Sequence, residues 1–443
     1  MFTFFYFLQT ICFFSYYILI DIIIYHNYDI FYSFKQFYRN RLARLYYGDI
    51  FFRQIYGKIG KYLILNKNKS LNTYSRCLNF SSYDYLGINE MKLNSSDYLN
   101  LDITSTNNEL KNTISDFLAY KYIILSNTGY ATNAKYIKLM CDVPNYLILI
   151  DQYIHNSSIV GSKNLNKKIF KHNDLNHLET LLKTHPNNKI FVFIEGLYSM
   201  HGHFINIPNL IELKNKYKFK LVVDEAHSFG SIGYNGKGVF NLYYDDISKY
   251  IDIYVATFSK TCNANGGFIA TNNLNIYNRL QTCQTEYIHA ISAKHITNII
   301  RYINSENGEK DLEYIHNMSK YLYWKLKQNG CEIFSDEYSI VQCINIGSVH
   351  QGSTFSRYAL DNNLAITVVG YPAAELLNLT LRLCISKYHT KEDIDYLISV
   401  INNKPLKNYI NQELIDNDII QYQNIESIQE RRTRNTNSNE SLR

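Results

Sequence analysis

Short apolar runs alternate with amphipathic stretches through the middle of the chain. The runs are rich in β-branched residues, and polar or Gly-containing sequence follows them, which is typical of buried parallel strands. They predict strands at 122–125, 146–150, 168–170, 190–194, 221–223 and 251–256. Helices are predicted between them at 109–119, 175–183 and 208–217. This alternation predicts an α/β fold with a mostly parallel, doubly wound sheet that carries helices on both faces.

Beyond residue 270 the pattern becomes more helical and predicts a smaller C-terminal α/β domain. Its helices are expected at 291–303, 312–329 and 389–403, and its strands at 340–346, 367–369 and 379–385. We therefore predict a connector at 35–76, a large domain at 77–285 and a small domain at 286–408. Residues 409–443 are rich in Asn, Gln and charged residues, which predicts a polar, solvated tail.

The first apolar run is much longer than the others, and residues 2–25 contain no Lys or Arg. This run is a candidate membrane segment, since about 20 apolar residues span a bilayer. Four basic residues follow between positions 35 and 44, and the positive-inside rule places the rest of the chain on the cytosolic side. Asp21 leaves an in-plane anchor or a buried helix open. We predict membrane attachment through residues 1–34.

Composition removes several function classes. The net charge of +6 is spread along the chain without a basic stripe, which argues against a nucleic-acid partner. The eight Cys residues are scattered and form no C-x-x-C pair. They fit free thiols in a reducing compartment better than a disulfide framework or a zinc site, so no metal is expected.

Candidate chemistry gathers after two of the predicted strands. Asp224 and His227 follow the strand at 221–223, while Thr257 and Lys260 follow the strand at 251–256. A Lys amine can hold pyridoxal phosphate as a Schiff base, and an Asp against the pyridine nitrogen keeps that ring protonated. Each residue alone is more simply a solvated surface group. Together, at neighbouring strand ends, they favour a cofactor site.

Three further candidates are weaker when taken singly. The turn Ser126–Tyr130 follows a strand and opens a helix, so its N–H groups could bind a phosphate. His155 could stack on a flat ring, or it could simply begin a helix. Arg382 lies on an alternating strand, where an ordinary solvent-facing residue is the simpler interpretation.

Several motifs resemble one family. They are QFYRNR at 36–41, FSSYDYLG at 80–87, IFKHND at 169–174, EGLYSMHG at 195–202, VDEAHSFG at 223–230, VVGYPA at 368–373 and CISKYHTKEDID at 384–395. Over about residues 36–403 the chain resembles the α-oxoamine synthases, which are fold-type I pyridoxal-phosphate enzymes. Within that family it is most similar to the catalytic-subunit branch of the serine palmitoyltransferases.

The resemblance implies a role for each candidate. Lys260 would form the Schiff base and act as the catalytic base, and His155 would stack on the cofactor ring. The other cofactor-binding residues would be Asp224 at the ring nitrogen, His227 at the ring hydroxyl, Ser199 near the ring, and Thr128, Gly129, Tyr130 and Thr257 around the phosphate. Arg382 would bind the amino-acid carboxylate through its fork of donors, with Tyr85 also on the substrate side.

The resemblance also implies a reaction and partners. L-serine would condense with a long-chain acyl-CoA, with loss of CO₂, to give a 3-keto long-chain base, which is the first step of sphingolipid synthesis. The chain would pair with a non-catalytic homologous subunit or with a second copy of itself. It would be attached to the endoplasmic reticulum membrane, with the catalytic domain facing the cytosol.

Three departures from the family keep alternatives open. No Gly occurs between Gly87 and Gly129, Asn263 replaces a family Gly, and residues 292–296 lack the family's Pro. One alternative is another α-oxoamine synthase, such as aminolevulinate synthase; the membrane run and VVGYPA argue against it. A second is a non-catalytic partner subunit, which the shortened segment after Gly87 favours. The presence of Lys260 argues against that assignment, because the non-catalytic subunit lacks a Lys there.

Overall fold

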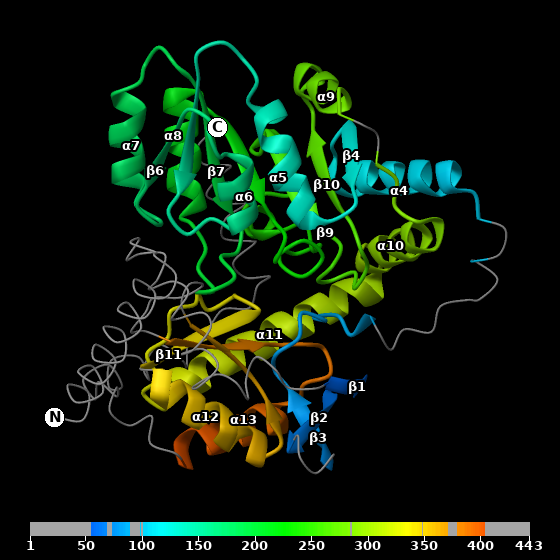
Figure 1. Cartoon of the computed structure of the whole chain (residues 1–443), viewed down its shortest axis with the longest axis vertical. Coiled ribbons are helices and arrows are strands. Elements are labelled where there is room, and N and C mark those ends of the chain that lie inside the picture. The colour runs from blue at the N-terminus through cyan, green and yellow to red at the C-terminus, as the bar shows by residue number, and fades with distance from the viewer. Residues whose placement is uncertain are drawn as a thin grey trace, which may run out of the picture. The chain divides into compact units, whose positions relative to one another are not determined.

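The computed structural model describes residues 55–68, 73–88, 98, 101–283, 286–347, 349–370 and 379–403 (Figure 1). The predicted membrane run, the QFYRNR motif and the polar tail lie outside these residues. Within the described ranges, no helix combines the length and the apolar character that a membrane crossing requires.

The chain divides into two compact units. Unit 1 consists of Met1–Leu78 and Ile346–Leu381, and unit 2 consists of Asn79–Asn345 and Arg382–Arg443. Unit 2 begins close to the predicted start of the large domain at residue 77. It then continues past the predicted limit at 285, because helices α10 (Ala290–Ile303) and α11 (Glu306–Gln328) belong to it.

A seven-stranded sheet forms the centre of unit 2, in the order β4-β10-β9-β8-β7-β5-β6. Its strands are β4 (Tyr122–Ser126), β5 (Tyr146–Asp151), β6 (Lys167–Phe170), β7 (Lys189–Glu195), β8 (Lys220–Asp224), β9 (Ile253–Thr257) and β10 (Gly267–Thr271). The six predicted strands are all present. The sheet is mixed, however, because β10 runs antiparallel to both β9 and β4. Strand β10 was not predicted.

Both faces of this sheet are buried, which explains the near-continuous apolar runs in its sequence. On one face, alternate residues of β5, β7 and β9 pack against α5 (Gly129–Met140) and α9 (Leu274–Gln281). That cluster includes Ile148, Ile150, Phe191, Phe193, Val222, Ile253, Val255 and Ile269 from the strands, and Tyr136, Ile137, Ile276 and Leu280 from the helices. The intervening strand residues, such as Leu149 and Val223, are buried on the other face.

Helix boundaries in unit 2 follow local capping chemistry. The helices besides those already given are α4 (Ile103–Leu118), α6 (Asn156–Gly161), α7 (Leu175–Lys183), α8 (Ile207–Tyr217) and α13 (Lys391–Asn403). Side chains of Asp102, Asp174 and Asn206 accept backbone N–H groups at the starts of α4, α7 and α8. Helix α8 also has Pro208 in its first turn, where a missing N–H costs nothing.

Unit 1 contains structure that the prediction missed, because residues 35–76 were interpreted as a connector. Its four-stranded sheet has the order β1-β2-β3-β12 and comprises β1 (Ile55–Ile59), β2 (Tyr62–Asn68), β3 (Thr73–Asn79) and β12 (Leu364–Ala365). Gly60 takes a φ of +51° in the tight β1–β2 turn. Leu63, Leu65, Cys77, Leu360 and Ala365 form its small apolar cluster, which α12 (Val349–Asp361) helps to build.

The predicted C-terminal strands are present in a third sheet. Its order is β11-β14-β13, with β11 (Val341–Gly347), β14 (Leu379–Cys384) and β13 (Thr367–Val369). Strand β14 is fully buried along its length, so its alternating pattern does not reflect a solvent-facing side. The simpler interpretation of Arg382 as an exposed strand residue is therefore wrong.

A buried histidine in α11 makes stability depend on pH. His316 is 3% exposed, and its Nε2 donates to the carbonyl oxygen of Ser231 at 2.9 Å. Burial lowers the pKa of His316 from 6.5 to about 4, so folding favours the neutral ring. This contribution is complete above pH 6.5 and is lost as the pH falls toward 4.

We expect the free energy of unfolding to fall by up to about 3 kcal/mol between pH 7 and pH 4 through this residue. His316→Gln, which retains a donor for Ser231, should flatten this pH dependence in urea-unfolding measurements. His185→Gln, at a partly exposed position, is the control. Identical slopes for wild type and His316→Gln would show that His316 does not carry the effect.

Candidate active site

The carboxyl ends of the parallel strands meet at one edge of the seven-stranded sheet and border a cavity of about 310 Å³. Glu195 ends β7, Asp224 ends β8 and Thr257 ends β9. The cavity is lined by Thr128, Gly129, Tyr130, His155, Ser157, Glu195, Asp224, Ala226, His227, Ala256, Thr257, Ser259, Lys260, Asn265 and Gly266. The fold thus gathers groups from segments more than a hundred residues apart.

Most of the predicted site residues meet in this cavity. Those that line it are Thr128, Gly129, Tyr130, His155, Asp224, His227, Thr257 and Lys260. Ser199, Tyr85 and Arg382 are buried but are not among the lining residues. The lining also includes Ser157, Glu195 and Asn265, which the sequence did not suggest.

One corner of the cavity is suited to an anion. Thr128 caps the twelve-residue helix α5, and its side-chain oxygen accepts the N–H of Ala131 at 3.0 Å. The first N–H groups of a helix have no partner within the helix, and they carry its positive dipole end. Gly129 lies so close to Thr257 that an added Cβ would be 2.5 Å from Thr257 Oγ1. A side chain at position 129 would therefore occupy part of this corner.

The Asp224 carboxylate is fixed by two donors. The side-chain amide of Asn133, on α5, donates to Oδ2 at 2.6 Å, and the N–H of Ala226 donates to Oδ1 at 3.0 Å. Asp224 is only 8% exposed. Asn133 was missed by the sequence analysis, because a single Asn inside a helix has no pattern that marks it as functional.

Lys260 is the cation of the cavity and is held largely away from water. Burial lowers the pKa of its amine, while the carboxylates of Asp224 and Glu195 act in the opposite direction. A lowered pKa increases the fraction of neutral amine, which is the nucleophilic and basic form. This environment suits a lysine that reacts rather than one that only forms an ion pair.

Beside Lys260, the ring of Tyr83 connects three of the predicted groups. Its centroid lies 5.2 Å from that of His227, 4.8 Å from Cζ of Arg382 and 5.9 Å from Nζ of Lys260. Tyr85, which was predicted on the substrate side, is fully buried in the core instead. The motif S-Y-D-Y contains both tyrosines, and the sequence offered no means of choosing between them.

Two buried nitrogen atoms in this cluster lack partners among the described residues. They are Nδ1 of His227 and Nε of Arg382. Buried polar groups in folded proteins are nearly always hydrogen-bonded, so such atoms mark places where a ligand could bind. Burial, with the cations Lys260 and Arg382, lowers the pKa of His227, which favours a neutral ring able to donate or accept one hydrogen bond.

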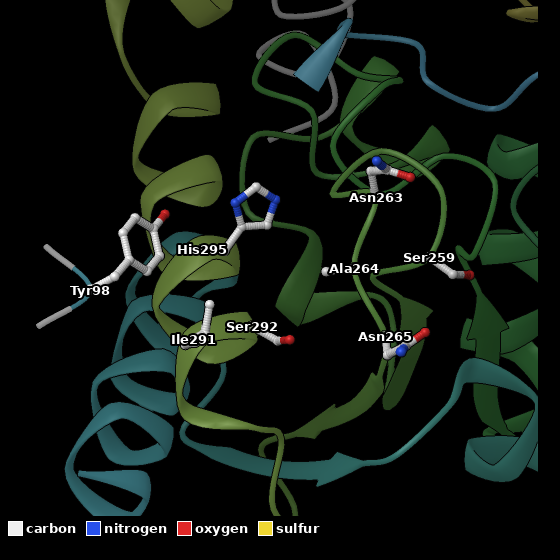
Figure 2. Close-up of a pocket in the computed structure, with 8 residues that line it drawn as sticks. All are labelled: Tyr98, Ser259, Asn263, Ala264, Asn265, Ile291, Ser292 and His295. Carbon is white, nitrogen blue, oxygen red and sulfur yellow. The ribbon is translucent and has the colours of Figure 1, made fainter. Parts of the chain in front are cut away.

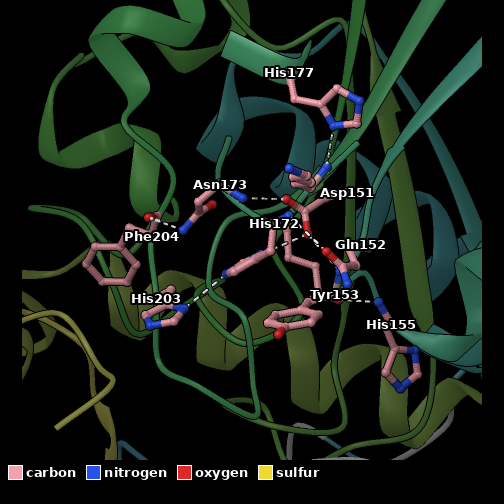
Figure 3. A network of polar contacts seen from close by, with 11 residues as sticks. Asp151, Gln152, Tyr153, His155, His172, Asn173, His177, His203 and Phe204 are labelled. Carbon is pink, nitrogen blue, oxygen red and sulfur yellow. Dashed lines mark hydrogen bonds and ion pairs between the residues drawn. The ribbon is translucent and has the colours of Figure 1, made fainter. Parts of the chain in front are cut away.

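His155 is held at the cavity by the segment that leads from β5. Its N–H donates to the Glu195 carboxylate. Earlier in that segment, Asp151 Oδ1 accepts the N–H of Tyr153 at 2.8 Å and contacts Nδ1 of His172 at 2.8 Å. His172 Nε2 lies 2.9 Å from Nδ1 of His203, as Figure 3 shows. This network of loops after β5, β6 and β7 was not predicted.

A second cavity of about 540 Å³ adjoins the loop that follows Lys260 (Figure 2). It is lined by Tyr98, Ser259, Asn263, Ala264, Asn265, Ile291, Ser292 and His295, so it shares Ser259 and Asn265 with the first cavity. Asn263, which stands where the resembled family has Gly, adopts a φ of +47°. Asn tolerates this left-handed conformation better than other side-chain-bearing residues, so the substitution keeps the turn that Gly would allow.

The arrangement supports chemistry on a phosphate-bearing ring cofactor. It supplies a buried amine, a fixed carboxylate, a neutral imidazole and a helix N-terminus around one cavity. No group of three or more His, Cys, Asp or Glu residues in the described ranges could hold a metal ion. Together with the mixed α/β sheet, these features define a fold-type I enzyme of the pyridoxal-phosphate class.

Comparison with known proteins gives the family. The family described as aminotransferase class I and II matches residues 76–401. Serine palmitoyltransferase 2 of Schizosaccharomyces pombe is 32% identical over an alignment of 412 positions that covers 82% of this chain and 68% of that protein. Long chain base biosynthesis protein 2b of Arabidopsis thaliana is 34% identical over 74% of each chain. The chain therefore belongs to the aminotransferase class I and II family and, within it, to the serine palmitoyltransferase 2 group.

Solved structures agree on the fold. A serine palmitoyltransferase with pyridoxal phosphate has a TM-score of 0.74 at 21% identity, covering 85% of this chain and 98% of that one. The Sphingomonas wittichii serine palmitoyltransferase also has a TM-score of 0.74, at 19% identity, covering 84% of this chain and 96% of that one. The predicted fold-type I architecture is confirmed.

Proposed function

We propose that the chain is the catalytic subunit of a serine palmitoyltransferase. It uses pyridoxal phosphate to condense L-serine with a long-chain acyl-CoA, releasing CO₂ and CoA. The observation that carries the proposal is the position of Lys260, a half-buried amine whose pKa is lowered by burial and which lines, with Asp224, a cavity bordered by a helix N-terminus. The names of the relatives and the motifs around the cavity support the same reaction. A non-catalytic role would leave this arrangement of buried charges without a purpose.

The residues present fit the cofactor. The anion corner at Thr128 and Gly129 suits its phosphate, Asp224 suits its ring nitrogen, and the unpartnered Nδ1 of His227 suits its ring hydroxyl. Lys260 would hold it covalently. When bound, pyridoxal phosphate withdraws electrons from the attached amino acid and makes its Cα proton acidic.

The chain's own groups then position the substrate and move its proton. Arg382 offers an unpartnered Nε in a buried site, and its planar fork can bind the serine carboxylate with two hydrogen bonds. The Tyr83 ring lies against that guanidinium and limits its rotation. The neutral fraction of Lys260, enlarged by burial, takes the proton from Cα through Nζ.

A condensation also needs space for a second substrate next to the lysine. The larger cavity provides it, because it shares Ser259 and Asn265 with the cofactor cavity and continues past the turn at Asn263. Ile291, Ser292 and His295 on α10 form its far wall in Figure 2. We assign the acyl-CoA thioester to this side of Lys260.

The proposal includes a membrane and a partner subunit. Residues 2–25 carry no Lys or Arg, and both the acyl-CoA and the long-chain product partition into bilayers. That run and the basic residues after it support membrane attachment with the catalytic part in the cytosol, and the resemblance supports the endoplasmic reticulum as the membrane. The partner is a non-catalytic homologous subunit or a second copy of this chain.

Covalent labelling tests the assignment of Lys260. Borohydride treatment of protein loaded with pyridoxal phosphate should fix the cofactor on Nζ of Lys260, and peptide mass spectrometry should locate it there. Lys260→Ala should lose the label, whereas Lys249→Ala, at an exposed lysine, should keep it. Equal labelling of wild type and Lys260→Ala would remove Lys260 from the cofactor site.

Substitution of Arg382 tests the carboxylate site. Arg382→Lys replaces a fork of two hydrogen bonds by a point charge, so the KM for serine should rise about tenfold or more, with a smaller change in kcat. The measurement is steady-state kinetics at saturating acyl-CoA. Arg301→Lys, at an exposed ion pair with Glu109, should leave the KM unchanged. An unaltered KM in Arg382→Lys would exclude Arg382 from serine binding.

Alkaline extraction of membranes tests the attachment. We expect the full chain to stay with the membrane pellet, and a variant with Phe13→Lys and Tyr16→Lys to be released, because a charge in the centre of a span costs about 3 kcal/mol. Release of the wild-type chain, or retention of both proteins, would show that residues 2–25 do not anchor it.

A further inference from the structure

Behind the Asp224 carboxylate, two polar side chains connect it to His155. The Asn133 amide nitrogen lies 2.6 Å from Asp224 Oδ2 and 3.1 Å from the Ser157 hydroxyl oxygen. That hydroxyl lies 2.8 Å from Nδ1 of His155. Asn133 is 2% exposed and Ser157 is 1% exposed, so these two side chains are shielded from water, whereas His155 at the end of the connection is exposed.

The donors in this connection can be assigned from chemistry. An ionised carboxylate only accepts hydrogen bonds, so the Asn133 atom facing Asp224 is its NH₂ group. Both hydrogens of that group are then used, one toward Asp224 and one toward Ser157. The Ser157 hydroxyl accepts from Asn133, and its own hydrogen is free to point at His155 Nδ1.

The backbone fixes the protonation of His155 independently. The N–H of Ser157 donates to Nδ1 of His155 at 3.2 Å. A backbone N–H cannot accept, so Nδ1 carries no proton, and the single proton of the neutral ring lies on Nε2. Two donors therefore converge on Nδ1, and both belong to Ser157.

We propose that Asn133 and Ser157 are positioning residues that join the Asp224 carboxylate to His155 and hold His155 as the neutral tautomer with its proton on Nε2. The Asn133 amide donates one hydrogen bond to Asp224 and a second to the Ser157 hydroxyl. The Ser157 hydroxyl in turn donates to Nδ1 of His155. The connection acts through Asp224 and His155. Ser157 lines the cavity, but neither Asn133 nor Ser157 supplies a reacting group.

The charges around His155 act in opposite directions on the protonation of its ring. Lys260 disfavours a charged ring, whereas Asp224 favours one, and the Tyr130 ring lies edge-on at 6.3 Å. Glu195 holds the backbone of His155 but not its ring. Burial favours the neutral ring, and the two donors at Nδ1 then decide which nitrogen keeps the proton.

The consequence for the proposed reaction rests on the proposed function. A neutral imidazole can lie against a protonated pyridine ring without repulsion, whereas an imidazolium would meet a like charge there. The same Asn133 keeps Asp224 oriented with its remaining lone pairs toward the cavity. The Asn133 amide thus orients the Asp224 carboxylate, proposed to face the nitrogen of the cofactor ring, and also His155, proposed to stack on the face of that ring.

The tautomer is measured in cofactor-free protein, so the result does not depend on the proposed reaction. NMR of protein labelled with ¹⁵N-histidine, with His155→Gln to assign the signal, should show His155 neutral with Nδ1 unprotonated down to pH values below 6.5. Ser157→Ala should raise the pKa of His155 and increase the Nδ1-protonated form. Ser157→Thr, which restores a hydroxyl, should return the wild-type pattern.

Proton occupancy on Nδ1 in wild type would overturn the tautomer assignment. An identical pattern in Ser157→Ala would show that the backbone N–H alone holds the tautomer, and it would overturn the role proposed for the Ser157 hydroxyl. A structural effect alone would not be rescued by the Ser157→Thr hydroxyl. Failure of the Lys260 labelling experiment would instead overturn the proposed function and leave this result intact.

Pyridoxal-phosphate binding tests the role of Asn133. Asn133→Leu keeps the size but removes both donors, so the dissociation constant of the cofactor should rise about tenfold or more, because hydrogen bonds to charged groups are the stronger ones. The pH dependence of the bound cofactor's absorbance should shift as well. Asn176→Leu, at an exposed position in helix α7, is the matched control and should bind as wild type.

An unchanged dissociation constant and pH profile in folded Asn133→Leu would refute the positioning role. If Asn133→Leu does not fold, the comparison of Ser157→Ala with Ser157→Thr decides the proposal, because these substitutions change the side chain less.

Discussion

The register of the parallel strands is the constraint on which the site depends. Glu195 of β7 pairs with Asp224 of β8, and Asp224 pairs with Val255 of β9, two residues before Thr257. Both acids therefore reach the same edge of the sheet, and the chain leaving β9 brings Lys260 to them. A shift of one residue would turn Asp224 to the opposite face of the sheet. The apolar core on both faces prevents that shift and thereby fixes the chemistry.

The same edge must hold opposite charges with little water. Burial and the Asp224 charge raise the pKa of Glu195, because a second negative charge is disfavoured at this buried edge. Asp224 tolerates its position because two N–H donors replace the lost water.

The sequence revealed the parts of the molecule that have local patterns. Apolar runs predicted the strands, and the polar groups just after them predicted Asp224, His227, Thr257 and Lys260 at one cavity. It did not reveal β10, whose antiparallel pairing is a long-range property, or the hairpin of β1 and β2, which contains few apolar residues on its exposed side. Tyr83 and Asn133 were missed because their contacts arise only when distant segments meet. A buried Asn and an exposed one look alike along the chain.

Two departures from the resembled family, Asn263 and residues 292–296, lie at the larger cavity rather than at the cofactor cavity. Asn263 keeps a left-handed turn, so the loop after Lys260 does not need a Gly to retain its course. Residues 292–296 form part of α10, where Ser292 and His295 line the larger cavity and are not among the residues that line the cofactor cavity. These two departures therefore lie at the cavity proposed for the second substrate, while the lining around Lys260 has the polar groups that suit the cofactor.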